Sequence, residues 1–309
     1  MDDIVDILSV SGSGALFEGP VWDARSDQLY WVDILLRKLY RLDIRSGSIR
    51  SWSAPERCSA VIPMAKNAQE FLVPGERRIW LFDSGSGQFT SWVALAGEPD
   101  NNRCNDAKCD PWGALWLGSM DLDEQALTGA HWRVSADGRA DCIRTGLGIA
   151  NTWCWDATRQ RVYWADSKSG NIYVSSFGST GGLVEVSEGF EIFVRSSDAP
   201  GVPDGSAIDM DGNIWNARWG SGLVIGFDPE GREIARLPTG WKYPTSCAFY
   251  GSGMNELAVT CASTAFVDSR VPTSAEPRTT SAAIISVRTG TTGAEVALFG
   301  VYEERDTYL

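Results

Sequence analysis

The same strand-turn-strand pattern recurs along most of the chain, and this repetition is the strongest constraint on its fold. In each unit, short runs rich in aromatic and branched residues are separated by turns of Asp, Gly and Asn. Corresponding strand positions lie roughly 40 to 50 residues apart, the interval of four-stranded propeller blades. These positions are Trp31, Leu72, Trp116, Trp164, Trp215 and Ala258. The repeats predict an all-β fold, a six-bladed β-propeller with four-stranded blades.

A β-sandwich is the alternative, but a sandwich does not require self-similar units of this length. The chain shows no linker, so one domain over residues 1–309 is expected. We expect a strand near Ala15-Leu16-Phe17 to pair into the last blade and close the ring, which removes an exposed edge. The polar segment Asp268 to Ser281 breaks the rhythm and is predicted to be a long loop in blade six.

Charge and composition exclude several classes of partner. The formal net charge of −13 argues against nucleic acid or an anionic membrane, because both attract basic surfaces. No run of about eighteen apolar residues exists and the first residues lack a basic start, so a cytoplasmic location is expected. The seven cysteines are dispersed without a Cys-x-x-Cys pair, which predicts reduced thiols. A monomer or a small homo-oligomer fits equally well.

Propeller geometry makes distant residues converge, because the first strand of every blade lines the central channel and starts at the same face. Glu18, Asn105, Asp106, Asn151 and Asp204 precede or open these strands. Asp204 follows Pro203 and precedes Gly205, so its backbone can be held tightly. Two carboxylates and a carboxamide without a basic neighbour would repel one another unless a cation lay between them. Oxygen ligands select a hard or borderline divalent ion, which predicts a metal site. Each residue alone is more typical of a turn or cap.

The motifs around these residues resemble the gluconolactonase/regucalcin family of sugar lactonases. They are Phe17-Glu18-Gly19-Pro20-Val21-Trp22, Asn102-Arg103-Cys104-Asn105-Asp106-Ala107, Trp116-Leu117-Gly118-Ser119-Met120, Asn151, Pro203-Asp204-Gly205 and Pro244-Thr245-Ser246-Cys247-Ala248-Phe249. The match spans about residues 15 to 262, with the motifs in the family's order.

The resemblance implies a six-bladed propeller that hydrolyses sugar lactones with one catalytic divalent metal, held by Glu18, Asn151 and Asp204. It further implies that Arg103 and Asn105 contact the substrate. Two departures stand out. Asn151 is followed by Thr152-Trp153-Cys154-Trp155, where the family usually has Gly and small apolar residues. Asp121 stands where some relatives have Glu, and the resemblance implies that this shorter side chain contacts the substrate.

A mechanism for lactone hydrolysis fits these residues. The metal would act as a Lewis acid on the carbonyl, and Asp204 would take a proton from water as general base. Calcium, zinc, manganese, magnesium and ferrous iron all accept such ligands. A second hypothesis is a non-enzymatic calcium-binding regulator of the same fold, and a third is a propeller that serves as an interaction scaffold.

Other signals have simpler explanations. His131 lies between Ala130 and Trp132 in a predicted strand, and no Gly-x-Ser-x-Gly elbow exists, so a serine mechanism is not expected. Asp209-Met210-Asp211-Gly212-Asn213 lacks the Glu and Gly positions of a calcium loop and is predicted to be a hairpin turn. Strand aromatics such as Trp31 and Trp164 are expected to pack between blades. Trp153 or Trp155 could instead face a sugar at the channel mouth.

Overall fold

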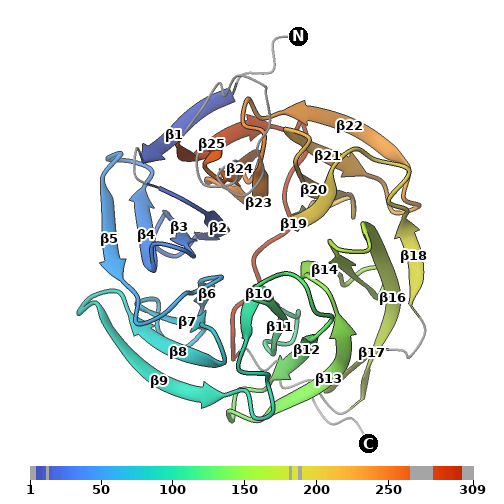
Figure 1. The fold of residues 1–309 in the computed structure, drawn as a ribbon. Helices are drawn as coiled ribbons and strands as arrows, with labels where there is room; N and C mark the ends of the chain where they lie inside the picture. Colours follow the sequence, from blue (N-terminus) through green and yellow to red (C-terminus); the bar gives the residue numbers. More distant parts are fainter. Residues whose placement is uncertain (1–4, 12–13, 181–182, 187–189, 265–280, 301–309) are drawn as a thin grey trace, which may run out of the picture.

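A computed structural model describes residues 5–11, 14–180, 183–186, 190–264 and 281–300. Their strands form six antiparallel sheets arranged as the blades of a ring (Figure 1). The prediction of a six-bladed β-propeller is therefore confirmed. Within the described residues, no helix is both long and apolar enough to cross a membrane.

In blades one to five the strands run outward from the channel in chain order, whereas blade six has the N-terminal strand β1 as its outermost strand. Blade one comprises β2 (Phe17–Asp23), β3 (Gln28–Asp33), β4 (Lys38–Asp43) and β5 (Ile49–Ser53). Blade two comprises β6 (Ile62–Pro63), β7 (Glu70–Pro74), β8 (Arg78–Asp83) and β9 (Gln88–Ala94). Blade three comprises β10 (Asn102–Cys109), β11 (Leu115–Asp121), β12 (Gly129–Val134) and β13 (Ala140–Leu147).

Blade four comprises β14 (Ala150–Asp156), β15 (Arg161–Asp166), β16 (Asn171–Thr180), β17 (Leu183–Val186) and β18 (Glu191–Val194). Blade five comprises β19 (Val202–Ile208), β20 (Ile214–Trp219), β21 (Leu223–Phe227) and β22 (Glu233–Pro238). Blade six comprises β23 (Pro244–Tyr250), β24 (Glu256–Cys261), β25 (Ala282–Arg288) and β1 (Val5–Ser11). In blade four, β17 and β18 both pair with the long strand β16.

The ring closes through β1, which is the outermost strand of blade six and pairs with β25. The expectation that Ala15-Leu16-Phe17 would do this was wrong. Phe17 already begins β2 in blade one, and Leu16 makes only a single bridge to Ala262. The closing strand lies about ten residues earlier in the chain, and Ala15 and Leu16 instead lead directly into β2 of blade one. Their backbone N–H groups donate to the carboxylate of Asp33. The predicted loop at 268–281 lies outside the described residues except for Ser281.

Recurring Asp residues build the hairpins between the first two strands. The Asp209 carboxylate accepts hydrogen bonds from the backbone N–H of Asp211 and Asn213 and from the Trp215 indole, at 3.0, 2.8 and 2.9 Å. Asp110 binds the N–H of Trp112 and the Trp116 indole in the same way. The predicted hairpin at 209–213 is confirmed, because this carboxylate is occupied by its own turn.

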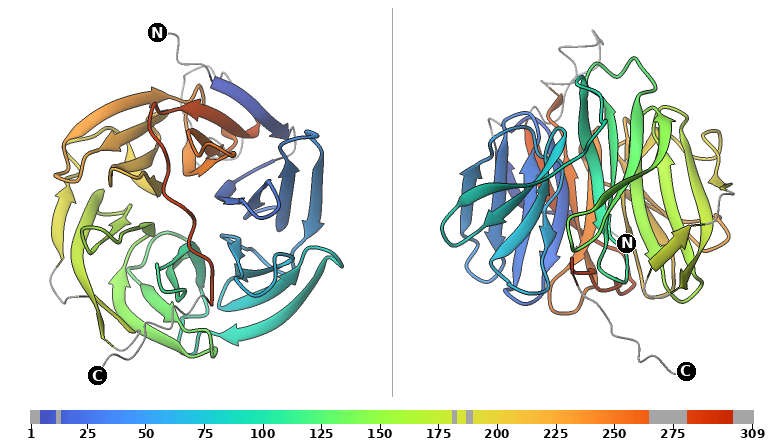
Figure 2. Two further views of the ribbon diagram at one scale, coloured as in Figure 1. Left: turned by 180° about the vertical axis from the view of Figure 1, so that it is seen from behind. Right: turned by 90° about the horizontal axis from the view of Figure 1, so that it is seen from below.

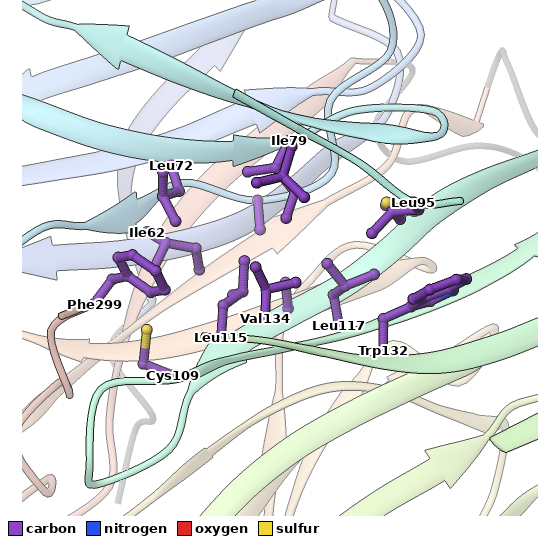
Figure 3. Packing of buried hydrophobic residues seen from close by; sticks show 14 of the residues in the cluster. Ile62, Leu72, Ile79, Leu95, Cys109, Leu115, Leu117, Trp132, Val134 and Phe299 are labelled. Atoms are coloured by element: carbon purple, nitrogen blue, oxygen red, sulfur yellow. The ribbon is translucent and has the colours of Figure 1, made fainter. Parts of the chain in front are cut away.

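Aromatic and aliphatic side chains fill the space between blades. Figure 3 shows one such cluster, where Ile62 and Leu72 of blade two meet Leu115 and Leu117 of blade three. Trp31 and Trp164 are buried, as expected for packing between blades. Six of the seven cysteines are buried and all seven are free, which agrees with the prediction of reduced thiols.

A segment after β25 crosses one end of the channel, and we call residues 290–300 the strap. It is drawn in dark red across the centre of the ring in Figure 2. Backbone hydrogen bonds join the strap to Met210 of blade five and Met254 of blade six. Others join it to Pro63 of blade two and Gly113 of blade three. Between the strap and the first strands lies a cavity of about 450 Å³, whose lining includes Lys108, Ala207, Ser246 and Val296.

Candidate functional site

A local break in strand pairing lies at or directly after each candidate ligand. The register shifts between Glu18 and Val21 in β2, between Asn151 and Cys154 in β14, and between Pro203 and Ser206 in β19. Such bulges bend a strand and re-aim its side chains. All three breaks lie at the end of the channel opposite the strap, which we call the site end.

The structure brings Glu18, Asn151 and Asp204 together with Asn105 and Arg103. Burial raises the pKa of the Glu18 carboxyl well above its usual value, and the neighbouring charges of Asp204 and Asp106 raise it further. Burial likewise raises the pKa of Asp204, followed by the charge of Asp106. These carboxylates therefore share a poorly solvated space in which their like charges destabilise one another.

Arg103 is a basic neighbour that the sequence argument did not expect. Its charge opposes the rise in the pKa of both Glu18 and Asp204. Burial lowers the pKa of the Arg103 guanidinium, while Glu18 and Asp204 act to raise it. The expectation of acidic residues with no basic partner was therefore wrong, because Arg103 folds back along β10. There its Nη1 donates to Asn105 Oδ1 at 2.8 Å and to the Cys104 carbonyl at 2.9 Å.

Hydrogen bonds fix the orientation of the Asn151 amide. Its Nδ2 donates to Ser167 Oγ at 2.8 Å, and Ser167 in turn donates to the Pro203 carbonyl at 2.6 Å. Its Oδ1 accepts from Asn105 Nδ2 at 3.0 Å. An amide oxygen has two lone pairs, so one remains for a further partner. Ser167 was missed in the sequence, since nothing in a lone Ser after a strand distinguishes it.

The donor chemistry fits a hard divalent cation. Two buried carboxylates, each with a raised pKa, and one oriented amide oxygen are the ligands such an ion prefers. Among the described residues, no three His, Cys, Asp or Glu side chains are grouped to hold a metal by themselves. The amide of Asn151 would therefore have to complete the set.

Asp121 has a visible structural role. It ends β11 as Asp33 ends β3 and Asp166 ends β15, and each of these carboxylates binds the turn that follows. Asp121 accepts from the N–H of Gln125 and Ala126, both at 2.9 Å, and these bonds lower its pKa. It orders the loop that carries Glu124, whose charge acts on Arg103. The recurrence of Asp at this strand end was a signal for this role. A contact with substrate stays a prediction.

The aromatic candidates and the histidine lie behind the site. Trp153 and Trp155 stack at 6.4 Å and pack on Trp116 between blades three and four. Both side chains are buried in this cluster, and both residues also line the cavity next to the strap. A contact of either ring with a sugar stays a prediction. His131 is buried against Trp153 and Trp164, and burial lowers its pKa to about 3. It is neutral at ordinary pH, as expected for a structural residue.

Fold and site together define a six-bladed propeller with an oxygen-rich, acidic site in its central channel. Residues 16–263 match the family model described as SMP-30/Gluconolactonase/LRE-like region, and the chain belongs to this family. The resemblance drawn from the sequence motifs is thereby confirmed.

Several relatives have informative names. A pentonolactonase of Haloferax volcanii is 31% identical over 253 residues, covering 82% of this chain and 84% of that protein. An L-arabinolactonase of Azospirillum brasilense is 32% identical over 242 residues, covering 77% and 78%. Among solved structures, a calcium-binding protein, regucalcin, from Agrobacterium tumefaciens superposes with a TM-score of 0.84 at 28% identity, covering 96% and 97% of the two chains.

Proposed function

We propose that this protein is a metal-dependent lactonase that hydrolyses a sugar lactone to the corresponding aldonic acid. One observation carries the proposal: Glu18 and Asp204 are buried together, with raised pKa values, beside the oriented amide of Asn151. Relatives named pentonolactonase and L-arabinolactonase support the choice of substrate class.

In this proposal Glu18, Asn151 and Asp204 hold one divalent cation. When bound, the ion supplies Lewis-acid polarisation of the lactone carbonyl and offsets the charge of the two carboxylates. Asp204 takes a proton from the attacking water and later delivers it to the ring oxygen that leaves. The proton is thus conserved between the attack on the carbonyl and the opening of the ring.

Arg103 and Asn105 orient the substrate. The Arg103 guanidinium uses only Nη1 in its bonds to Cys104 and Asn105. Its remaining N–H groups can reach sugar hydroxyls, and its planar fork favours a fixed orientation. Asn105 anchors the amide of Asn151 and lies beside it. Asp121 contributes by ordering the loop near Arg103.

A panel of five-carbon and six-carbon aldonolactones tests the proposal. The protein is stripped with chelator, reloaded separately with calcium, zinc, manganese, magnesium or ferrous iron, and assayed for proton release. We expect turnover of at least one lactone that is lost on chelation and restored by metal. Metal binding without turnover of any lactone would instead favour a calcium-binding regulator, the role suggested by the name of the Agrobacterium protein.

A further inference from the structure

Two of the proposed ligands are followed by a residue in the left-handed backbone region. Gly19 after Glu18 has φ +54°, and Thr152 after Asn151 has φ +63°. Both lie within the bulge that lifts the ligand into the channel. Glycine adopts this region freely, whereas the Cβ of a branched residue crowds its own backbone there. A threonine in the position that glycine fills in blade one requires a reason.

The Thr152 side chain is fully buried and joins blade four to blade five. Its hydroxyl donates to the backbone carbonyl of Asp204. The same oxygen accepts from Asn216 Nδ2 at 3.1 Å and from Ser206 Oγ at 3.3 Å. Asn216 Nδ2 also lies 3.0 Å from the Asp204 carbonyl. One side chain thus bonds directly to the main chain of one ligand and is the covalent neighbour of another.

Buried groups behind this junction hold it in place. Arg218 Nη1 donates to Asn216 Oδ1 at 3.2 Å, which leaves the Asn216 amide nitrogen to face Thr152. Arg218 is fully buried and is itself fixed by the carbonyls of Ala199, Pro200 and Gly201. An unfavourable backbone conformation persists only where its surroundings determine it in this way.

We infer that Thr152 is a positioning residue that sets the placement of Asn151 relative to Asp204. Glycine would satisfy the backbone at 152 but would leave the two ligand-bearing strands without this tie. The hydroxyl is the feature that glycine lacks, so its bonds are the reason that a strained threonine is kept. The inference rests on the proposed function, since it concerns the same ligands.

Metal binding to the stripped protein tests the inference apart from turnover. Calcium and manganese are titrated calorimetrically into wild type, Thr152→Gly, Thr152→Val and Thr152→Ser, and thermal unfolding of each metal-free protein is recorded. We expect the Gly and Val variants to bind the ion at least roughly tenfold more weakly, as when other groups that orient ligands are removed. Thr152→Ser, which keeps the hydroxyl, should restore affinity to near the wild-type value.

Stability separates positioning from simple packing. Relief of the left-handed strain offsets part of the cost of losing the buried side chain, so metal-free Thr152→Gly should remain folded at the temperature of the titration, although its affinity falls. Gln160→Gly is the matched control. Gln160 is an exposed residue with φ +54° beyond the other end of β14, and its variant should bind metal like wild type.

Three results would overturn the inference. Wild-type affinity in folded Thr152→Gly or Thr152→Val would show that the hydroxyl positions nothing. An equal loss in Gln160→Gly would show that any change of backbone freedom near β14 has the same effect. Failure of wild type to bind either ion would remove the metal site from the proposed function, and this inference with it.

Discussion

At one end of the central channel the first strands present Glu18, Asn151 and Asp204, and at the other end the strap crosses the same strands. At the site end, bulges break the pairing and carboxylates are buried close together. At the strap end, Asp carboxylates are satisfied by their own hairpins and the crossing segment is held by backbone hydrogen bonds and by Phe299. Two of the first strands, β2 and β19, therefore join a buried carboxylate at the site end, Glu18 or Asp204, to a carboxylate at the strap end, Asp23 or Asp209, that is bonded within its own hairpin.

The strand β19 offers the sharpest test of this contrast, because it places Asp204 at one end and leads into Asp209 at the other. Asp204→Asn should lower kcat/KM on the best lactone by about 10³-fold, because it removes the proposed general base and weakens a proposed metal ligand. Asp209→Asn should leave turnover near the wild-type value. It should lower the unfolding free energy by roughly 1–3 kcal/mol, since its new N–H₂ would face donors.

Steady-state kinetics and urea unfolding of the two variants, measured side by side, give both quantities. Full turnover in Asp204→Asn would end the assignment of Asp204 as base. A loss of turnover in Asp209→Asn, with its stability unchanged, would erase the distinction between the two ends.

Removal of the Phe299 side chain should weaken the strap end without touching the chemistry. Phe299 is buried, lies 5.5 Å from Trp92 between ring centroids, and belongs to the cluster shown in Figure 3. We expect Phe299→Ala to lower the unfolding free energy by about 3 kcal/mol, as for other buried Phe to Ala changes. Activity at a temperature where the variant is folded should be unchanged. A fall in kcat there would show that the strap supports the site through the channel.

The contrast should also appear as a dependence of stability on pH in the metal-free protein. Because the pKa of Asp204 is raised, the folded protein keeps a proton that the unfolded chain loses near pH 4. Stability therefore falls as pH rises from about 4 towards the raised pKa, by up to ~1.4 kcal/mol per pH unit. The single histidine acts in the opposite direction, since its pKa of about 3 stabilises the fold as pH rises towards 6.5.

Comparison with Asp204→Asn cancels the contribution of His131, which is equal in both proteins, and measures Asp204 together with its effect on the pKa of Glu18. In chelator the variant should be more stable than wild type at pH 8, and this advantage should shrink towards pH 4. Urea unfolding across this range measures the difference. An advantage that grew as pH fell would mean that Asp204 is ionised and favourably paired in the metal-free fold.

The repeat and the converging strand starts could be predicted from sequence because both follow from periodicity. The six strand-turn-strand units recur every roughly 40 to 50 residues and so define the blades. Blade geometry alone then brings Glu18, Asn151 and Asp204 to one face. The closing strand could not be placed, because Val5–Ser11 mixes apolar and polar residues, Ala15-Leu16-Phe17 is a short apolar run, and only pairing in the fold selects between them. Ser167, Asn216 and Thr152 were beyond reach for a different reason. Their roles depend on side-chain hydrogen bonds between blades, and spacing along the chain carries no record of these.

The smallest expected effect comes from a carboxylate on the strap itself. Glu295 is exposed at the strap end. Glu295→Gln removes its charge, and this change should alter the free energy of unfolding by less than about 0.5 kcal/mol and leave activity unchanged. Glu18→Gln makes the same chemical change at the site end. It should weaken calcium or manganese binding by at least roughly tenfold, because a charged ligand becomes a neutral one. Calorimetric titration of both variants measures this difference. Equal affinities in Glu18→Gln and Glu295→Gln would mean that the buried position of Glu18 confers no role in holding the ion, and the acidic site would then have to be reassigned around Asp106.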